Sequence, residues 1–129
     1  EIASCLVGSE MCIRDRPGTG KAAIVLPDGV LTNSSAQYVR DFILEKFQLL
    51  AVVSLPQCAF AHFGAGVKTS IIFVRKRKAD EKPDENEAIF MAAPALIGYD
   101  ATGRKTDSQL DEIIQKYEEF QKDATPFFA

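Results

Sequence analysis

The 129-residue chain contains no tryptophan, only one histidine and three cysteines, and no large excess of either charge. Its cysteines, Cys5, Cys12 and Cys58, form no CxxC pair and the histidine is His62, so neither a disulfide framework nor a zinc site is expected. No apolar run approaches the roughly 20 residues that cross a bilayer, which predicts a soluble chain without a membrane span. The formal net charge of −3 neither supports nor excludes DNA as a partner.

The N-terminal segment 1–16, EIASCLVGSEMCIRDR, has no helical or strand period and no apolar stretch typical of a signal peptide. Back-translated in one frame, CLVGSEMCIRD resembles a transposase adapter used to prepare sequencing libraries. We therefore expect residues 1–16 to be translated adapter, with a genuine irregular N-terminal arm as the alternative. On this interpretation the native protein extends upstream of Pro17, and Cys58 is a lone thiol that fills apolar space.

From residue 17 onward, apolar runs and amphipathic stretches follow one another, which predicts an α/β fold. Three short apolar runs predict strands buried on both faces, at 21–26, 49–55 and 70–74. A weaker run lies at 88–92.

Two amphipathic helices are predicted. Asn33, Ser34 and Ser35 form a cap for a helix of about four turns. Its apolar residues have helical spacing: Val39, Phe42, Ile43, Phe47 and Leu50. Ser108, with Asp111 in a capping-box position, starts the other. Its apolar face comprises Leu110, Ile113, Ile114, Tyr117 and Phe120.

Two helices are too few to cover both faces of three apolar strands. We infer that 17–123 is a fragment of a larger α/β domain and that 124–129 is a truncated tail. An apolar sheet edge left exposed promotes aggregation, so we expect the isolated chain not to fold well.

Several local motifs have ordinary structural explanations. The sequence Gly18-Thr19-Gly20-Lys21 resembles a phosphate-binding loop, but Ala22 replaces the hydroxyl that would hold magnesium and a strand follows in place of a helix. A plain turn is the better interpretation. Asp28 could be a general base, but Pro-Asp-Gly is typical of a turn. His62 has no evident partner and is interpreted as a loop residue.

Two further segments leave alternatives open. The basic run 75–78 could hold DNA phosphates, but acidic residues follow at once, which favours a solvated strand end. Residues 56–68 have no helical period and predict a long irregular loop, a kind of segment that is often functional.

A specific resemblance rests on three segments in order: VLPDGVL at 25–31, VSLPQCAF at 53–60 and GVKTSIIF at 66–73. Together with the tail YDATGRKTDSQLDEIIQKYEEF at 99–120, they resemble the second half of the methylase (M) subunit of type I restriction-modification systems, an N-6 adenine-specific DNA methyltransferase. The resemblance covers 17–123. It implies a partial Rossmann-like, S-adenosylmethionine-dependent methyltransferase fold that contains the late strands and helices.

In that family S-adenosyl-L-methionine lies at the carboxyl ends of early strands, and a flipped adenine is held over an Asn-Pro-Pro-aromatic loop. The resemblance places both upstream of Pro17, so no catalytic, cofactor-binding or metal residue is expected in this chain, which should be inactive alone. It implies DNA, a specificity (S) subunit and a restriction (R) subunit as partners, in a prokaryotic cytoplasm. A non-catalytic α/β interaction module and a nucleotide-triphosphatase fragment remain alternatives.

The resemblance also suggests what the chain contributes. In related methyltransferases a phenylalanine packs against the flipped base. The LP-x-x-x-F spacing makes Phe60 the first candidate for a wall of the target-base pocket and Phe63 the second, with core packing as the alternative for each. Lys68 and Thr69, in the GVKTS stretch, are candidates for anchoring the loop or facing DNA.

Overall fold

The computed structural model describes residues 18–128. The predicted adapter segment 1–16 therefore lies outside the described residues. No helix in the described part is long and apolar enough to cross a membrane.

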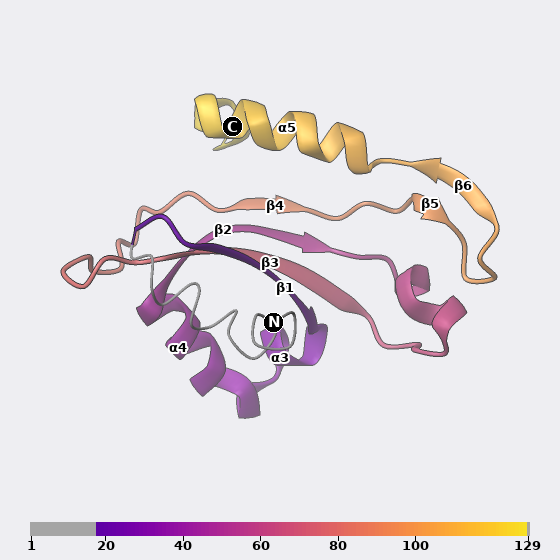
Figure 1. The fold of residues 1–129 in the computed structure, drawn as a ribbon, viewed down its shortest axis with the longest axis horizontal. Helices are drawn as coiled ribbons and strands as arrows, with labels where there is room; N and C mark the ends of the chain where they lie inside the picture. The colour runs from indigo at the N-terminus through magenta and orange to yellow at the C-terminus, as the bar shows by residue number, and fades with distance from the viewer. Residues whose placement is uncertain (1–17, 129) are drawn as a thin grey trace, which may run out of the picture.

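A four-stranded mixed sheet forms the centre of the fold (Figure 1), with the strand order β1-β3-β2-β4. Its strands are β1 (Lys21–Pro27), β2 (Phe47–Ser54), β3 (Thr69–Lys76) and β4 (Phe90–Ala92). β3 is antiparallel to both of its neighbours, whereas β4 is parallel to β2. The three predicted strands and the weaker apolar run are therefore confirmed. Because β1 and β2 are both antiparallel to β3, they run in the same direction and their carboxyl ends lie at the same end of the sheet.

The first predicted helix is shorter than expected. α3 (Asp28–Thr32) and a 3₁₀ turn, η1 (Ser34–Ala36), lead into α4 (Gln37–Lys46), and β2 begins at the next residue. Phe47 and Leu50, predicted to be helical, therefore belong to β2. Phe47 pairs with Lys76 of β3, and Leu50 lies at an irregularity between the paired residues Leu49 and Ala51. Pairing of the strand with β3 overrides the helical spacing.

Neither predicted helix cap forms as expected. Ala36 is the N-cap of α4, while Asn33 precedes η1 and makes no side-chain capping bond. In the C-terminal part, β5 (Ile97–Tyr99) and β6 (Lys105–Ser108) form a hairpin that leads into α5 (Leu110–Lys122) and η3 (Thr125–Phe128). Gln109 is the N-cap of α5, and the Ser108 hydroxyl accepts a 3.3 Å hydrogen bond from the Leu110 amide. The predicted cap is displaced by one residue.

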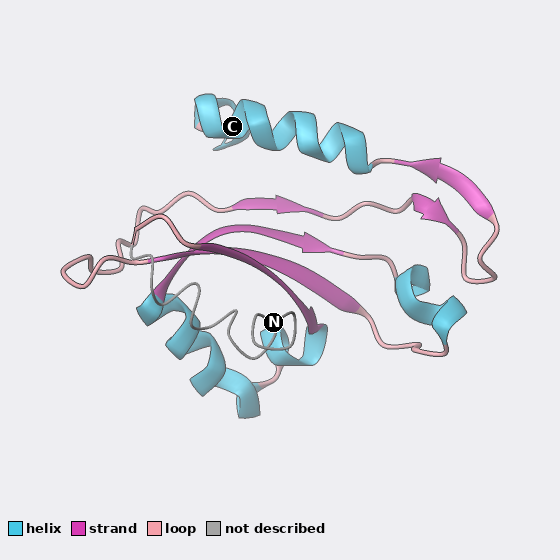
Figure 2. Cartoon of the chain, viewed as in Figure 1, coloured by secondary structure: helices cyan, strands magenta, loops and turns pink. Residues whose placement is uncertain are grey.

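Figure 2 shows α4 on one side of the sheet and α5 on the other. α5 packs through an aromatic cluster in which the ring of Phe90 contacts Tyr117, Phe120 and Phe127. Ile114, predicted to lie on the packed face, is 56% exposed. Neither helix has a fully buried residue, so both cover the sheet incompletely.

Buried apolar residues lie along β2 and β3, and Ile72 and Val74 of β3 are each only 1% exposed. The core cluster beside the end of β2 consists of Val53, Leu55, Ala59 and Ile97. The prediction that β1 is buried on both faces is wrong for this chain, because Ile24 is 39% and Val25 51% exposed. β1 is an edge strand, and no strand of the described residues pairs with its outer edge.

The open edge of β1 has a measurable consequence. We expect the isolated chain to unfold without a sharp thermal transition and to bind the dye ANS, because its apolar sheet surface remains accessible. Circular dichroism during heating and ANS fluorescence measure both properties. A single cooperative melt without dye binding would contradict the prediction.

Candidate functional site

The carboxyl ends of β1 and β2 meet the start of β3 at one end of the sheet. Pro27 at the end of β1 is paired with Thr69, and Ser54 at the end of β2 is paired with Ser70. Strand ends that point the same way collect the segments that follow them, which is where α/β proteins commonly place ligands. Here those segments are α3 and the connection from β2 to β3.

The connection after β2 is more ordered than its sequence suggested. Residues Gln57–Phe63 form a 3₁₀ helix, η2, where an irregular loop was predicted. Gly64 ends it with φ at +83°, and its amide donates to the carbonyl of Ala61. The Gln57 side chain donates a 2.7 Å hydrogen bond to the Gly66 carbonyl, which ties the start of the connection to its end.

The two candidate phenylalanines have different surroundings. Phe60 is half-buried and packs against the core cluster, so the position of its ring depends on β2 and the later hairpin. Phe63 is 74% exposed and touches the ring of His62 edge-on at a centroid distance of 5.3 Å. Phe60 is thus held in place, whereas Phe63 faces solvent.

Lys68 and Thr69 lie where the connection enters β3. The Lys68 side chain is 49% exposed, with its Nζ 3.8 Å from Asp28 Oδ2. The Thr69 carbonyl accepts a 3.0 Å hydrogen bond from the Leu55 amide. Its hydroxyl oxygen is buried without a hydrogen-bond partner among residues 18–128.

Asp28 plays a structural part that the sequence did not reveal. It begins α3, and its Oδ1 accepts a 2.7 Å hydrogen bond from the hydroxyl of Ser70, which is 3% exposed. Its amide donates to the Lys68 carbonyl at 3.0 Å. Asp28 therefore joins the end of β1 to the start of β3 across 42 positions of sequence. The predicted Pro-Asp-Gly turn is a helix start.

Substitution of Asp28 tests this junction. Asp28→Ala leaves the buried Ser70 hydroxyl without its partner, and we expect a loss of about 1–3 kcal/mol in the free energy of unfolding. Asp28→Asn keeps an acceptor oxygen and should lose less. Urea unfolding of the intact gene product measures both. Equal losses for the two variants would contradict the assignment.

The basic run after β3 is bound within the chain. Arg77 is buried, with a side chain 3% exposed, and both of its terminal nitrogens bind the carboxylate of Glu87. Arg75 binds Glu81 and Gln48. Both arginines bind side chains of the chain itself. The prediction of a solvated strand end is therefore wrong for them, and neither is placed to bind a DNA phosphate.

This ion-pair group also affects acid stability. The hydrogen bond from Arg75, followed by that from the Lys78 backbone, holds the pKa of Glu81 below its ordinary value. The ion pair of Glu81 therefore stabilises the fold at pH values above the ordinary pKa of a glutamate. This stabilisation is lost as the pH falls through the lowered pKa of Glu81.

The glycine-rich segment 18–21 forms a turn, as expected. Gly18 has φ at +83° and donates to the Lys76 carbonyl, and Lys21 begins β1 directly. A strand thus follows in place of the helix that a phosphate-binding loop requires.

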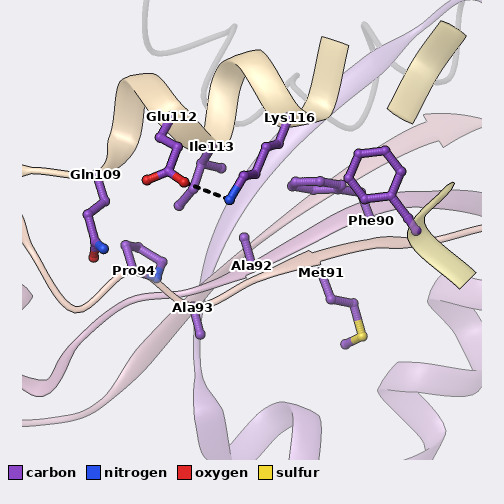
Figure 3. A pocket seen from close by; sticks show the side chains of 10 residues that line it. Phe90, Met91, Ala92, Ala93, Pro94, Gln109, Glu112, Ile113 and Lys116 are labelled. Atoms are coloured by element: carbon purple, nitrogen blue, oxygen red, sulfur yellow. Dashed lines mark hydrogen bonds and ion pairs between the residues drawn. The ribbon is translucent and has the colours of Figure 1, made fainter. Parts of the chain in front are cut away.

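A separate cavity of about 280 Å³ lies between β4 and α5 (Figure 3). Its wall includes Phe90, Pro94 and Ile113, and the Glu112–Lys116 ion pair crosses its rim. None of the candidate site residues line it. Within residues 18–128 there is no cluster of side chains suited to hold a metal ion.

Comparisons with known proteins agree with this architecture. A family model described as N-6 DNA Methylase matches residues 10–129. A chain from a structure of the type I R-M system is 26% identical with a TM-score of 0.51, and the match covers 84% of this chain and 21% of that one. No curated protein matches the chain.

Two other solved structures show the same fold at lower identity. The M protein of the type I restriction enzyme EcoKI is 24% identical, with a TM-score of 0.52 and coverage of 83% and 22%. A proposed class I S-adenosylmethionine-dependent methyltransferase from Listeria monocytogenes is 21% identical, with a TM-score of 0.55 and coverage of 84% and 30%. The chain therefore has part of a Rossmann-like methyltransferase fold and spans less than a third of these proteins.

Proposed function

Because the chain belongs to the N-6 DNA methylase family, we propose that it is the second half of the catalytic domain of an adenine-specific DNA methyltransferase. The intact gene product transfers a methyl group from S-adenosylmethionine to adenine N6 in DNA. The family match over residues 10–129 carries this proposal. The strand that follows the turn at 18–21 disfavours a nucleotide triphosphatase.

On this proposal, residues 17–123 contribute the late strands and helices of the catalytic domain. The sequence contains no Asn-Pro-Pro-aromatic motif, and no glycine-rich strand end follows β1 or β2. We therefore assign neither cofactor binding nor adenine activation to this chain. In the intact protein, S-adenosylmethionine supplies the methyl group.

The chain's own part in the reaction is to hold the flipped base. Phe60 lies after the shared ends of β1 and β2 and is supported by the core cluster. A supported aromatic ring can stack on an extruded adenine and offset part of the cost of unpairing it. Phe63 is the second candidate, and its exposure favours a contact outside the pocket.

Lys68 and Thr69 have separate roles in this proposal. The Lys68 side chain is half-exposed and makes only a long ion pair, 3.8 Å, with Asp28, so its ammonium group can exchange this partner for a DNA phosphate. Thr69 anchors the connection to β2 through its carbonyl. In an organism with a type I system, the methylase acts with DNA-specificity and restriction subunits in the cytoplasm.

Recovery of the upstream DNA and a methylation assay test the proposal. The codons before residue 17 should encode an Asn-Pro-Pro-aromatic motif preceded by a glycine-rich strand end. The intact product, incubated with its specificity subunit, DNA and labelled S-adenosylmethionine, should form N6-methyladenine. An upstream sequence that encodes EIASCLVGSEMCIRDR would show that segment 1–16 is native, and absence of both motif and methyl transfer would refute the proposal.

A further inference from the structure

The β5–β6 hairpin contacts η2 through Tyr99. The Tyr99 hydroxyl donates a 2.9 Å hydrogen bond to the carbonyl of Ala59, 40 positions earlier in the sequence. Ala59 is 2% exposed and immediately precedes Phe60. Ile97 of the same hairpin belongs to the core cluster on which Phe60 packs. The hairpin therefore touches both the backbone and the side-chain environment of the proposed base wall.

A second contact lies at the hairpin turn. A Cβ atom added to Gly103 would lie 2.7–2.9 Å from three ring atoms of His62, so the turn rests directly on that ring. His62, which had no partner evident in the sequence, is packed between Gly103 and Phe63. Gly103 also has φ at +81°, a conformation that favours glycine.

The turn is held by its own hydrogen bonds. The Asp100 carboxylate accepts from the hydroxyl and amide of Thr102 and from the Arg104 amide. These bonds, the one from the Thr102 hydroxyl first, keep the pKa of Asp100 below its ordinary value. A turn fixed in this way can transmit its position to a neighbouring segment.

We propose that the β5–β6 hairpin is a clamp that sets the position of η2, and that Tyr99 and Gly103 are positioning residues for the target base. This inference rests on the proposed function, because the clamp acts on the flipped adenine through Phe60. Neither residue needs to touch DNA or cofactor. Small displacements of a positioned group are sufficient to slow an enzymatic step.

Two substitutions in the intact gene product test the clamp. Tyr99→Phe removes only the hydrogen bond to Ala59. We expect kcat to fall about fivefold, the change in rate that corresponds to about 1 kcal/mol, the net contribution of one ordinary hydrogen bond. Gly103→Ala pushes the turn against His62 and should lower kcat further. KM for S-adenosylmethionine should not change in either variant.

Matched controls separate positioning from general damage. Tyr117→Phe removes the hydroxyl that accepts from Gln121 on α5, far from η2 in sequence. This variant should leave kcat close to that of the unmodified protein. His62→Ala, added to Gly103→Ala, should restore part of the lost activity because it removes the ring that clashes.

Two readouts follow η2 directly. Cys58 lies in η2 and is half-buried, so its rate of labelling by a thiol reagent, quantified by peptide mass, reports how often η2 opens. DNA with 2-aminopurine at the target position reports stacking, because a flipped base that loses its aromatic neighbour becomes brighter. Tyr99→Phe and Gly103→Ala should increase both signals.

The two readouts distinguish failure of the clamp from failure of the proposed function. Unchanged Cys58 labelling and unchanged kcat in both variants would overturn the clamp while leaving methyl transfer intact. If the unmodified protein transfers no methyl group, the proposed function fails together with any role in base positioning. Cys58 labelling would then still decide whether the hairpin holds η2.

Discussion

Replacing Glu87 with glutamine is expected to lower the free energy of unfolding by about 3 kcal/mol, because the substitution leaves Arg77 buried without its main counter-charge. Arg77 also donates to the Leu44 carbonyl, and its amide donates to the Lys46 carbonyl. The ion pair thus joins the end of α4 to the charged segment before β4. Urea unfolding of the intact gene product measures the loss.

The control for this prediction is an exposed ion pair. Glu112→Gln removes a carboxylate that bonds Lys116 at 2.6 Å, with both side chains more than half exposed, and should leave stability unchanged. Replacing both Arg77 and Glu87 with apolar residues of similar volume should restore much of the stability, since no uncompensated charge remains. Equal losses for Glu87→Gln and Glu112→Gln would contradict the burial argument.

Replacing Phe60 with alanine is expected to reduce kcat/KM of the intact methyltransferase by roughly 5- to 150-fold, which corresponds to the loss of one base-stacking contact of about 1–3 kcal/mol. Phe60→Leu keeps apolar volume against the core cluster and removes the aromatic ring. It should therefore retain stability yet lose most of the same activity. Methylation kinetics and a thermal melt of each variant separate the two effects.

Phe63→Ala provides the comparison for that experiment. Phe63 is 74% exposed, so its loss should leave stability unchanged and reduce activity much less than loss of Phe60. DNA with a mismatched target adenine costs less to unpair and should recover part of the activity of Phe60→Leu. If Phe63→Ala lowers activity more than Phe60→Ala and keeps full stability, Phe63 and not Phe60 forms the wall of the target-base pocket.

Local pattern was sufficient for the strands and for the family. The apolar runs at 21–26, 49–55 and 70–74 form strands because short runs of five to seven residues, mostly apolar and rich in β-branched types, favour a strand over a helix. The ends of β1 and β2 and the start of β3 lie together in the segments 25–31, 53–60 and 66–73. The resemblance therefore rests on residues that share one end of the sheet. The second helix was also predicted, within one residue at its start.

The boundary at Phe47 shows where local pattern fails. Phe47 suits the apolar face of a helix and the interior of a sheet equally well, and its pairing with Lys76 of β3 places it in the strand. In the same way, a basic run followed by acidic residues does not reveal that Arg77 is buried against Glu87. Partners that are distant in sequence determined both outcomes.

By itself, then, the sequence determined the strands, the α/β class and the family, because these depend on short-range periodicity and on contiguous motifs. The tertiary structure alone decided that β3 lies antiparallel between β1 and β2, that Asp28 bonds Ser70, and that Tyr99 reaches Ala59. The two hydrogen bonds join residues 42 and 40 positions apart. Such pairs leave no local signature, since either partner alone is an ordinary turn, strand or hairpin residue.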